Sequence, residues 1–532
     1  MTAEGVMVSY NYSEDEEHAN ILTVSASGLL FSNRWVLTHG SILSPLKQAQ
    51  AIQNLKGKPI LNEDFYDNLP EIHVTCEKKS SNVPNVYEGV EKMSRERNMD
   101  GDADFEHSSY QIRVLTGRIC HIWQCPILDR CVDDILYSWT IGHRDGDVDK
   151  QSQLGKTLLS VFVLVDLDDD RGNSVTQLSM ESFLTMPATP RARPPITKPW
   201  PDPRYAATRG PHVFLNAVTR GTICGVVGKK PSLLLTDTST ALGSEGGPVF
   251  TEGPTKELVG VVVCSVAWWR GEWVGLTLVA PLLSVLGAKL HVMPPAPAKP
   301  VGSHPYSGIL ERIDSTAVLV RCGAAWGAGV HLGAGYVITC AHVVTNYTIY
   351  KVSVYCKGVK ETAIVRYKTT DDKAYDLALL YMNPQYWTHL QAAVLASEPA
   401  VKGESVLAAG YPYFSERDLE PLRPTVTSGH VNSASPSLLH TSCCVQSGFS
   451  GGPIFRVTKD NAVEVLGIIV SSAKTHNGAC YPNINMAVPV RAFAQLLNNF
   501  LQDKDVSKLS TIENNREMIQ SQWRLMPYRS KI

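Results

Sequence analysis

Two stretches far apart in the chain repeat one turn. "LGSEGGPVF" (242–250) and "SGFSGGPIF" (447–455) both join Gly-Gly-Pro to an apolar pair, but Glu245 stands in the first where Ser450 stands in the second. "PSLLLT" begins fourteen residues before Glu245, and "PSLLHT" begins fourteen residues before Ser450. Likewise, Gly28 precedes Thr38 and Gly329 precedes Thr339 by ten residues each. Strings that recur at equal offsets indicate an internal repeat, so we expect one fold to occur twice.

Each repeat has the pattern of an all-β unit. Short β-branched and aromatic runs are separated by Gly, Pro, Asn and Ser. After Pro489 the apolar residues fall on one helical face, and a looser version follows Pro281. We therefore predict two tandem β units, each closing with a short C-terminal helix.

The predicted domain boundaries follow composition. Residues 1–292 form the first unit with long insertions, 293–305 a Pro-rich linker, 306–503 the second unit and 504–532 a tail. The surplus length of the first unit is assigned to surface insertions at 45–155 and 189–204. The apolar run 157–165 is too short to span a bilayer and is predicted to be one buried strand.

Composition excludes several function classes. The net charge of −2 provides no excess of positive charge that would bind nucleic acid or an anionic membrane. The acidic N-terminus lacks the apolar region of a secretory signal, which predicts synthesis in the cytosol without a membrane span. The twelve Cys stand mostly in apolar runs and are expected to be buried, reduced side chains.

Neither of two metal patterns is complete. Cys120, His121, Cys125 and Cys131 match no common zinc spacing. The Asp ladders from Asp100 and Asp145 lack the Gly and Glu that a calcium loop needs. We expect no metal and no organic cofactor.

The second unit carries residues suited to acyl transfer. His342 follows a strand-like run in "VITCAHVV", Asp376 opens "DLALL", and Ser450 lies in a Gly-rich turn. The order His, Asp, Ser occurs among known catalytic triads, with Ser as nucleophile, His as base and Asp as the residue that orients His. The N–H groups of Gly448 and Ser450 would form the oxyanion hole.

The first unit lacks this chemistry. The repeat offsets place Ser41 at the position of His342 and Glu245 at that of Ser450, while the Asp376 position falls near Ser160. Without base or hydroxyl nucleophile, this degenerate copy cannot run a triad mechanism. We expect the Glu245 carboxylate to fill the oxyanion hole.

These motifs resemble the Deg/HtrA branch of the trypsin-like serine proteases. The resemblance covers about residues 323–501 and implies a double β-barrel in each unit, although no PDZ domain follows. Phe449 replaces the Asp that trypsins use after N-terminal cleavage, so activation by such cleavage is not expected. Cys444 stands six residues before Ser450, where trypsin carries its S1 carboxylate, so the resemblance implies an uncharged S1 pocket and no preference for Lys or Arg.

The whole chain resembles the family of peroxisomal leader peptide-processing proteases. Ser530, Lys531 and Ile532 resemble the Ser-Lys-Leu import address. The resemblance implies a matrix protease that removes leader peptides, processes enzymes of fatty-acid β-oxidation and binds the import receptor through this tripeptide.

Other functions and properties stay open at the level of sequence. One alternative is a cytosolic Deg-type quality-control protease, and another is a scaffold that binds peptides by β-addition without catalysis. The sequence also permits a homo-oligomer. Self-cleavage is predicted near the polar segment 80–106, at Cys76, Cys120, Cys125 or Cys131.

Overall fold

The computed structural model describes most of both units. The described residues are 3–13, 21–31, 33–46, 49, 52, 65, 66, 68–77, 112–142, 148–167, 219–227, 232–240, 243–251, 258–269, 272–290, 307–370, 373–388, 390–412, 422–474, 480–513, 519 and 523. The predicted linker 293–305, the Asp ladder from Asp100, the segment 80–106 and the tripeptide 530–532 lie outside them. The second Asp ladder, from Asp145, is described only from Val148 onward, where it is helical. No described helix is long and apolar enough to cross a membrane.

The first unit begins with a closed six-stranded barrel in the order β1-β2-β3-β7-β5-β4. Its strands are β1 (Ala3–Ser13), β2 (Ile21–Phe31), β3 (Trp35–His39), β4 (Ile72–Glu77), β5 (Ile112–Gln124) and β7 (Val161–Leu167). The inward positions are apolar and fully buried, as the alternation of side chains along a strand requires.

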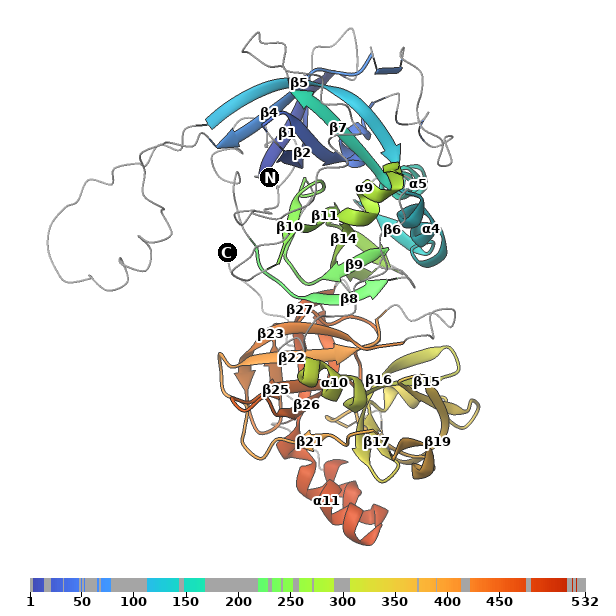
Figure 1. Cartoon of the computed structure of the whole chain (residues 1–532). Helices are drawn as coiled ribbons and strands as arrows, with labels where there is room; N and C mark the ends of the chain where they lie inside the picture. Colours follow the sequence, from blue (N-terminus) through green and yellow to red (C-terminus); the bar gives the residue numbers. More distant parts are fainter. Residues whose placement is uncertain are drawn as a thin grey trace, which may run out of the picture.

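A second layer completes the first unit. A five-stranded sheet has the order β10-β11-β14-β9-β8, and a small sheet has the order β13-β12-β6. The strands are β6 (Trp139–Ile141), β8 (Ile223–Val227), β9 (Leu233–Thr236), β10 (Pro248–Phe250), β11 (Leu258–Cys264), β12 (Ala267–Trp269), β13 (Glu272–Val274) and β14 (Thr277–Pro281). Helices α4 (Pro126–Ile135), α5 (Val148–Leu158) and α9 (Leu282–Leu290) lie along one side of this unit (Figure 1).

The second unit repeats this plan. Helix α10 (Ser307–Thr316) leads into a closed barrel, β15-β16-β17-β20-β19-β18. Its strands are β15 (Ala317–Cys322), β16 (Ala325–Gly333), β17 (Tyr336–Thr339), β18 (Val352–Cys356), β19 (Val359–Lys368) and β20 (Ala378–Tyr381).

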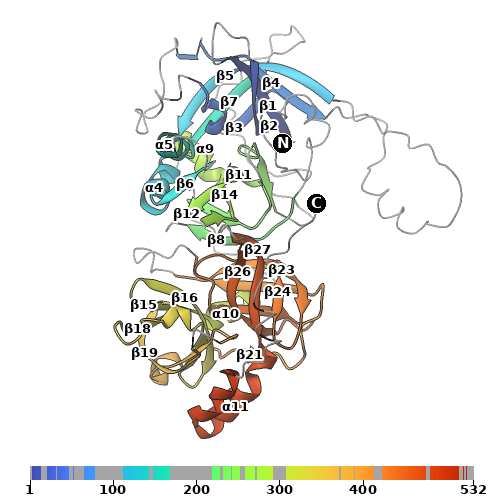
Figure 2. The same cartoon turned by 180° about the vertical axis from the view of Figure 1, so that it is seen from behind.

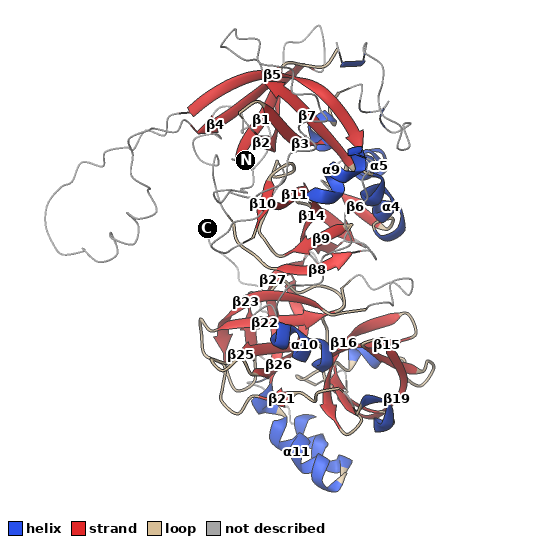
Figure 3. Ribbon diagram, in the orientation of Figure 1, coloured by secondary structure: helices blue, strands red, loops and turns tan. Residues whose placement is uncertain are grey.

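A seven-stranded sheet, ordered β21-β26-β25-β22-β23-β24-β27 with β26 also paired to β27, follows the barrel. Its strands are β21 (Val394–Leu395), β22 (Ser405–Gly410), β23 (Thr425–Ala434), β24 (Leu439–Thr441), β25 (Pro453–Val457), β26 (Val463–Lys474) and β27 (Cys480–Pro489). The short helices η3 (Pro384–Trp387) and η5 (Val490–Ala492), then α11 (Ala494–Asp503) and η6 (Val506–Glu513), complete the unit. Figure 3 shows the predominance of strands.

The topology confirms the predicted all-β tandem fold. The two closed barrels have the same strand order, β1-β2-β3-β7-β5-β4 matching β15-β16-β17-β20-β19-β18. In the second sheets, β10-β11-β14-β9-β8 matches β25-β26-β27-β24-β23. Strand β22 joins β25 to β23 and closes the second sheet, but the described part of the first unit has no such strand. The helices α9 and α11 follow these sheets, as predicted.

Two predictions about the first unit are wrong in part. The segment 45–155 is not merely a surface insertion, because it supplies barrel strands β4 and β5 as well as α4, β6 and much of α5. The run 157–165 is not one strand, because α5 extends to Leu158 and β7 begins at Val161. The continuous apolar character of this run hides the boundary, since a helix end and a buried strand are equally apolar here.

The two units are stacked along the long axis of the molecule (Figures 1 and 2). The sheet that contains β8 lies between the first barrel and the second unit in both views. Strand β8 contacts β23, and β13 contacts β27.

The Gly-Gly turn is held by the same backbone contacts in both units. Gly246 N–H donates to Val262 O and Gly451 N–H to Ile469 O, both at 2.8 Å. The φ angles of these glycines are 87° and 85°, in the left-handed region that favours glycine. A Cβ on Gly246 would lie 2.0 Å from Ser27 O, and one on Gly451 would lie 2.2 Å from Ala328 O. The repeated turn therefore requires glycine for both conformation and space.

We predict that Gly246→Ala strongly destabilises the first unit. The strained φ and the backbone overlap together should lower its free energy of unfolding by at least about 3 kcal/mol. Gly142 is a matched control, because its φ is also 87° but an added Cβ would meet nothing within 4 Å. Gly142→Ala should cost only about 1 kcal/mol. Calorimetric unfolding of both variants checks this, and equal losses would contradict it.

Candidate active site

The barrel topology of the second unit brings His342 to Asp376. Strand β17 pairs with β20 so that Thr339 lies opposite Ala378. His342 opens the short helix η2 (His342–Val344) just after β17, and Asp376 lies just before β20. The ring Nδ1 of His342 hydrogen-bonds to Asp376 Oδ2, and the His342 backbone N–H donates to Oδ1 at 3.0 Å.

The Asp376 carboxyl is held in its ionised form. Burial alone would raise its pKa, but hydrogen bonds from the His342 ring and backbone outweigh that effect and lower the pKa below its ordinary value. An ionised Asp376 accepts the Nδ1 proton of His342, which leaves Nε2 as the ring atom able to accept a proton. The His342 side chain is 49% exposed, so Nε2 is open to a reaction partner.

Ser450 lies next to this pair in the Gly-rich turn. Its carbonyl accepts a hydrogen bond from Ala328 N–H at 2.8 Å. A Cβ on Gly327 would lie 2.6 Å from Ser450 O and 2.7 Å from Val343 Cγ2, so the turn packs close to the residue after His342. The Ser450 hydroxyl donates to Val470 O at 3.2 Å, and no hydrogen bond among the described residues joins it to His342. The hydroxyl must therefore turn from Val470 O toward His342 before His342 can accept its proton.

Two backbone N–H groups beside Ser450 are unpaired. Among the described residues, the N–H groups of Gly448 and Ser450 have no hydrogen-bond partner. Tyr411 N–H donates to Gly448 O at 3.0 Å and fixes that peptide. Gly448 has φ 103°, and a Cβ there would lie 2.2 Å from Tyr411 O. Unpaired N–H groups at a nucleophile are what an oxyanion hole requires.

Cys444 lies in the contact between the units. Its side chain is 3% exposed, and its thiol donates to Gly275 O of the first unit at 3.1 Å. Gln446 Nε2 donates to the same sulfur at 3.4 Å. The assignment of Cys444 to the S1 pocket stays a prediction.

One set of side chains comes within metal-binding reach in the described part of the chain. It consists of Cys340, His342 and Asp376. However, Cys340 is wholly buried and donates its S–H to Ile469 O, and burial raises the pKa of its thiol well above the ordinary value. A neutral thiol is a poor metal ligand, since metals bind the thiolate. The group is better suited to orienting His342 than to binding a metal.

The first unit keeps the frame of the turn but changes its contents. Glu245 replaces Ser450, and its two carboxylate oxygens accept from Gly243 N–H at 2.8 Å and Ser265 N–H at 3.0 Å. Gly243 is the counterpart of Gly448 and also has a positive φ, 91° against 103°. The carboxylate therefore accepts a hydrogen bond from the Gly243 N–H, the counterpart of the unpaired Gly448 N–H. Burial raises the pKa of Glu245 above its ordinary value.

The remaining counterparts in the first unit are also unsuited to catalysis. Ser41 lies in η1 (Gly40–Leu43), and its N–H donates to His39 Nδ1 at 3.2 Å. His39 is buried, hydrogen-bonds through Nε2 to Leu159 O, and has its pKa lowered to about 4 by burial. The pairing of Thr38 with Val163 places Val161 at the position of Asp376, one residue beyond Ser160.

The Cys predicted as self-cleavage sites lie in regular structure. Cys76 is in β4, Cys120 in β5 and Cys131 in α4, while Cys125 caps α4. These segments must open before a protease can bind them in extended form. Self-cleavage stays a prediction.

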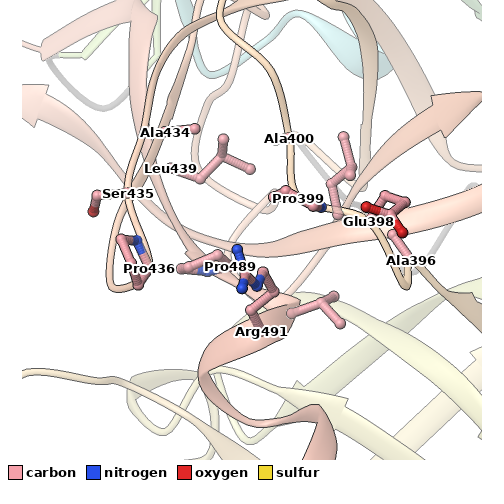
Figure 4. Close-up of a pocket in the computed structure, with 12 residues that line it drawn as sticks. Ala396, Glu398, Pro399, Ala400, Ala434, Ser435, Pro436, Leu439, Pro489 and Arg491 are labelled. Carbon is pink, nitrogen blue, oxygen red and sulfur yellow. The ribbon is translucent and has the colours of Figure 1, made fainter.

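The pocket in Figure 4 lies away from these residues. Its volume is about 110 Å³, and its charged lining residues are Glu398 and Arg491. Pro436 and Pro489 contribute apolar walls. None of His342, Asp376 and Ser450 lines it, so it does not supply the reaction site.

Two residues of the site gave no usable signal in the sequence. The Val470 carbonyl accepts a hydrogen bond from the Ser450 hydroxyl, and the Tyr411 N–H positions Gly448 by donating to its carbonyl. Both act through backbone atoms, which do not depend on residue type. Only the strand pairing of the second unit could have identified them.

Part of the chain is similar to a known protein family. Residues 327–468 match the trypsin-like peptidase domain. This range lies within the second unit. The matched range contains the positions of His342, Asp376 and Ser450.

Two known proteins are similar to part of this chain. The peroxisomal leader peptide-processing protease of Mus musculus is 32% identical over 341 residues, covering 59% of this chain and 57% of its own. The human protein of that name is 34% identical over 337 residues, with the same coverage. The chain thus spans a little over half the length of these relatives. The resemblance predicted from the sequence is confirmed.

The solved structures are more distantly similar to this chain. A serine endoprotease from Yersinia pestis is 22% identical and covers 38% of this chain and 70% of its own, with a TM-score of 0.31.

We predict that His39 makes the first unit sensitive to acid. Its folded pKa of about 4 lies below the ordinary 6.5, so the stability from neutral His39 is fully present above pH 6.5 and is lost as the pH falls toward 4. The difference amounts to about 3 kcal/mol. His39→Gln should flatten the dependence of the melting temperature on pH in this window. An unchanged slope would contradict the assignment.

Proposed function

We propose that the second unit is a serine endopeptidase with His342, Asp376 and Ser450 as its catalytic triad. The observation that carries the proposal is the His342–Asp376 pair beside a hydroxyl whose neighbouring N–H groups are unpaired. A base oriented by a carboxylate, a nucleophile and an oxyanion site are the parts that acyl transfer needs.

The roles follow from the hydrogen bonds. After rotation away from Val470 O, the Ser450 hydroxyl gives its proton to His342 Nε2 while its oxygen attacks the peptide carbonyl. Asp376 holds the ring and stabilises the imidazolium. The carbonyl oxygen becomes an oxyanion that accepts from Gly448 N–H and Ser450 N–H. His342 then protonates the leaving amine, and water hydrolyses the acyl enzyme by the same route.

For the substrates, we propose leader peptides of proteins imported into the peroxisome matrix. The names of the mouse and human relatives support this assignment. An uncharged S1 pocket at Cys444 would accept small or apolar side chains in place of Lys or Arg. The proposal extends to the processing of other peroxisomal enzymes, including those of fatty-acid β-oxidation.

We predict that Ser450→Ala abolishes labelling by a fluorophosphonate probe and lowers peptide cleavage by several orders of magnitude. Glu245→Ala is the matched control, because it changes the equivalent turn position of the first unit. The Glu245→Ala protein should still be labelled. Its free energy of unfolding should fall by about 1–3 kcal/mol, because the N–H groups of Gly243 and Ser265 lose their acceptor.

Gel analysis and mass spectrometry of both purified variants provide the readout. Cleavage that persists in Ser450→Ala would refute the assignment of the nucleophile. Loss of labelling in a folded Glu245→Ala protein would show that the first unit takes part in the chemistry. Fragments of the chain that appear in Glu245→Ala but not in Ser450→Ala would support self-cleavage.

We further propose that Ser530, Lys531 and Ile532 bind the peroxisomal import receptor. A fluorescent reporter that ends in the sequence Tyr-Arg-Ser-Lys-Ile, copied from residues 528–532, should collect in peroxisomes. A reporter with Lys531→Glu should remain diffuse, because the basic position of the tripeptide is lost. Equal distribution of the two reporters would reject the address.

A further inference from the structure

A partly buried carboxylate of the first unit, that of Asp237, binds a strand of the second unit. Asp237 Oδ2 accepts from Ser428 N–H at 2.9 Å and from Ser428 Oγ at 3.2 Å. Its other oxygen accepts from Thr222 N–H, and Thr222 Oγ1 lies 2.9 Å from Ser428 Oγ. Asp237 therefore bridges the backbones of the two units through charge-assisted hydrogen bonds, which are stronger than neutral ones.

The strand that Asp237 holds packs on the segment leading to Ser450. Ser428 lies in β23 between Thr427 and Gly429. Thr427 Oγ1 donates to Cys444 O at 2.9 Å, and a Cβ on Gly429 would lie 2.4 Å from Cys443 N. A displacement of β23 at Ser428 would therefore move residues 443 and 444, which begin the run that ends at the nucleophile.

The first unit also contacts that segment directly. The Cys444 thiol donates to Gly275 O, and its side chain belongs to the same apolar core as α4, β11 and β14. Burial chiefly raises the pKa of Cys444 to about 12, and the nearby Asp237 carboxylate adds to the effect. The thiol thus stays neutral and able to donate to Gly275.

A second line of contacts reaches the other end of the segment. Trp269 of the first unit packs edge-on against Trp326, with ring centroids 5.6 Å apart. Trp326 Nε1 donates to Tyr411 O at 3.0 Å, and Tyr411 N–H donates to Gly448 O. Both ends of the segment 444–448 are therefore supported from the first unit.

We infer that the first unit positions the substrate-binding segment 443–450 of the second unit and that Asp237 is the positioning residue at its S1 end. The inference rests on the proposed function. It assigns the catalytically degenerate copy a role in substrate binding that does not require chemistry of its own. Without Asp237, the N–H groups of Ser428 and Thr222 lose their acceptor, and the contact of β23 with β8 loses its carboxylate bridge.

The test uses full-length Asp237→Ala, Asp237→Asn and Asp166→Asn. Asp166 is the matched control, because it also carries a hydrogen-bonded carboxylate, paired to Arg34 within the first barrel. Peptide turnover gives KM and kcat, and the rate of fluorophosphonate labelling reports Ser450 without needing an S1 side chain. Hydrogen exchange followed by mass spectrometry reports the order of residues 443–450 independently of any activity.

For Asp237→Ala we expect KM to rise about tenfold, with labelling changed less than threefold and exchange at 443–450 about tenfold faster. Asp237→Asn keeps one acceptor oxygen and should recover part of both effects. Asp166→Asn should leave KM and this exchange unchanged. A protein that is merely less folded would lose apparent kcat at constant KM.

Two outcomes separate the inference from the proposed function. Unchanged exchange and KM in Asp237→Ala would overturn the inference while leaving the protease assignment standing. Absence of labelling in the wild type would refute the protease assignment. In that case faster exchange at 443–450 in Asp237→Ala, but not in Asp166→Asn, would still support the positioning role.

Discussion

The backbone hydrogen bonds around the Gly-Gly turn fix the geometry of both units. In the second unit Ala328 N–H binds Ser450 O and Gly451 N–H binds Ile469 O, and in the first unit Ser27 N–H binds Glu245 O and Gly246 N–H binds Val262 O. Each set ties a barrel strand to the opposing sheet at the turn. The side chain before the glycines is therefore delivered to the same place whatever its type, and the chemistry of each unit depends on that one residue and its neighbours.

The same backbone arrangement thus holds different charges and hydrogen bonds in the two units. In the second unit the N–H of Gly448 stays unpaired, which costs stability but leaves a donor for negative charge that develops during a reaction. In the first unit the Glu245 carboxylate satisfies the equivalent N–H of Gly243. In the first unit, the carboxylate therefore removes both the unpaired donor and the place where another anion could bind. The copy with a carboxylate at this position thus has the more completely hydrogen-bonded turn.

The sequence predicted what depends on local spacing. The repeat, the all-β class, the closing helices and the position of Ser450 in the turn all follow from offsets and turn residues. It did not predict that residues 45–155 contribute barrel strands, because β4 and β5 are separated by a long polar segment. It could not predict that Asp237 binds Ser428 either. Those residues are 191 positions apart, and only the packing of the two units joins them.

The unequal sheets explain why the two units meet at β8 and β23. In the second unit β22 lies between β25 and β23 and closes the ring of strands. In the described part of the first unit β8 is an edge strand, with no neighbour beyond it in its own sheet. An edge strand can meet another element, and β8 meets β23. The copy that has Glu245 in place of the Ser450 hydroxyl is also the copy whose open sheet lies against β23, the strand that we infer to position the segment before Ser450.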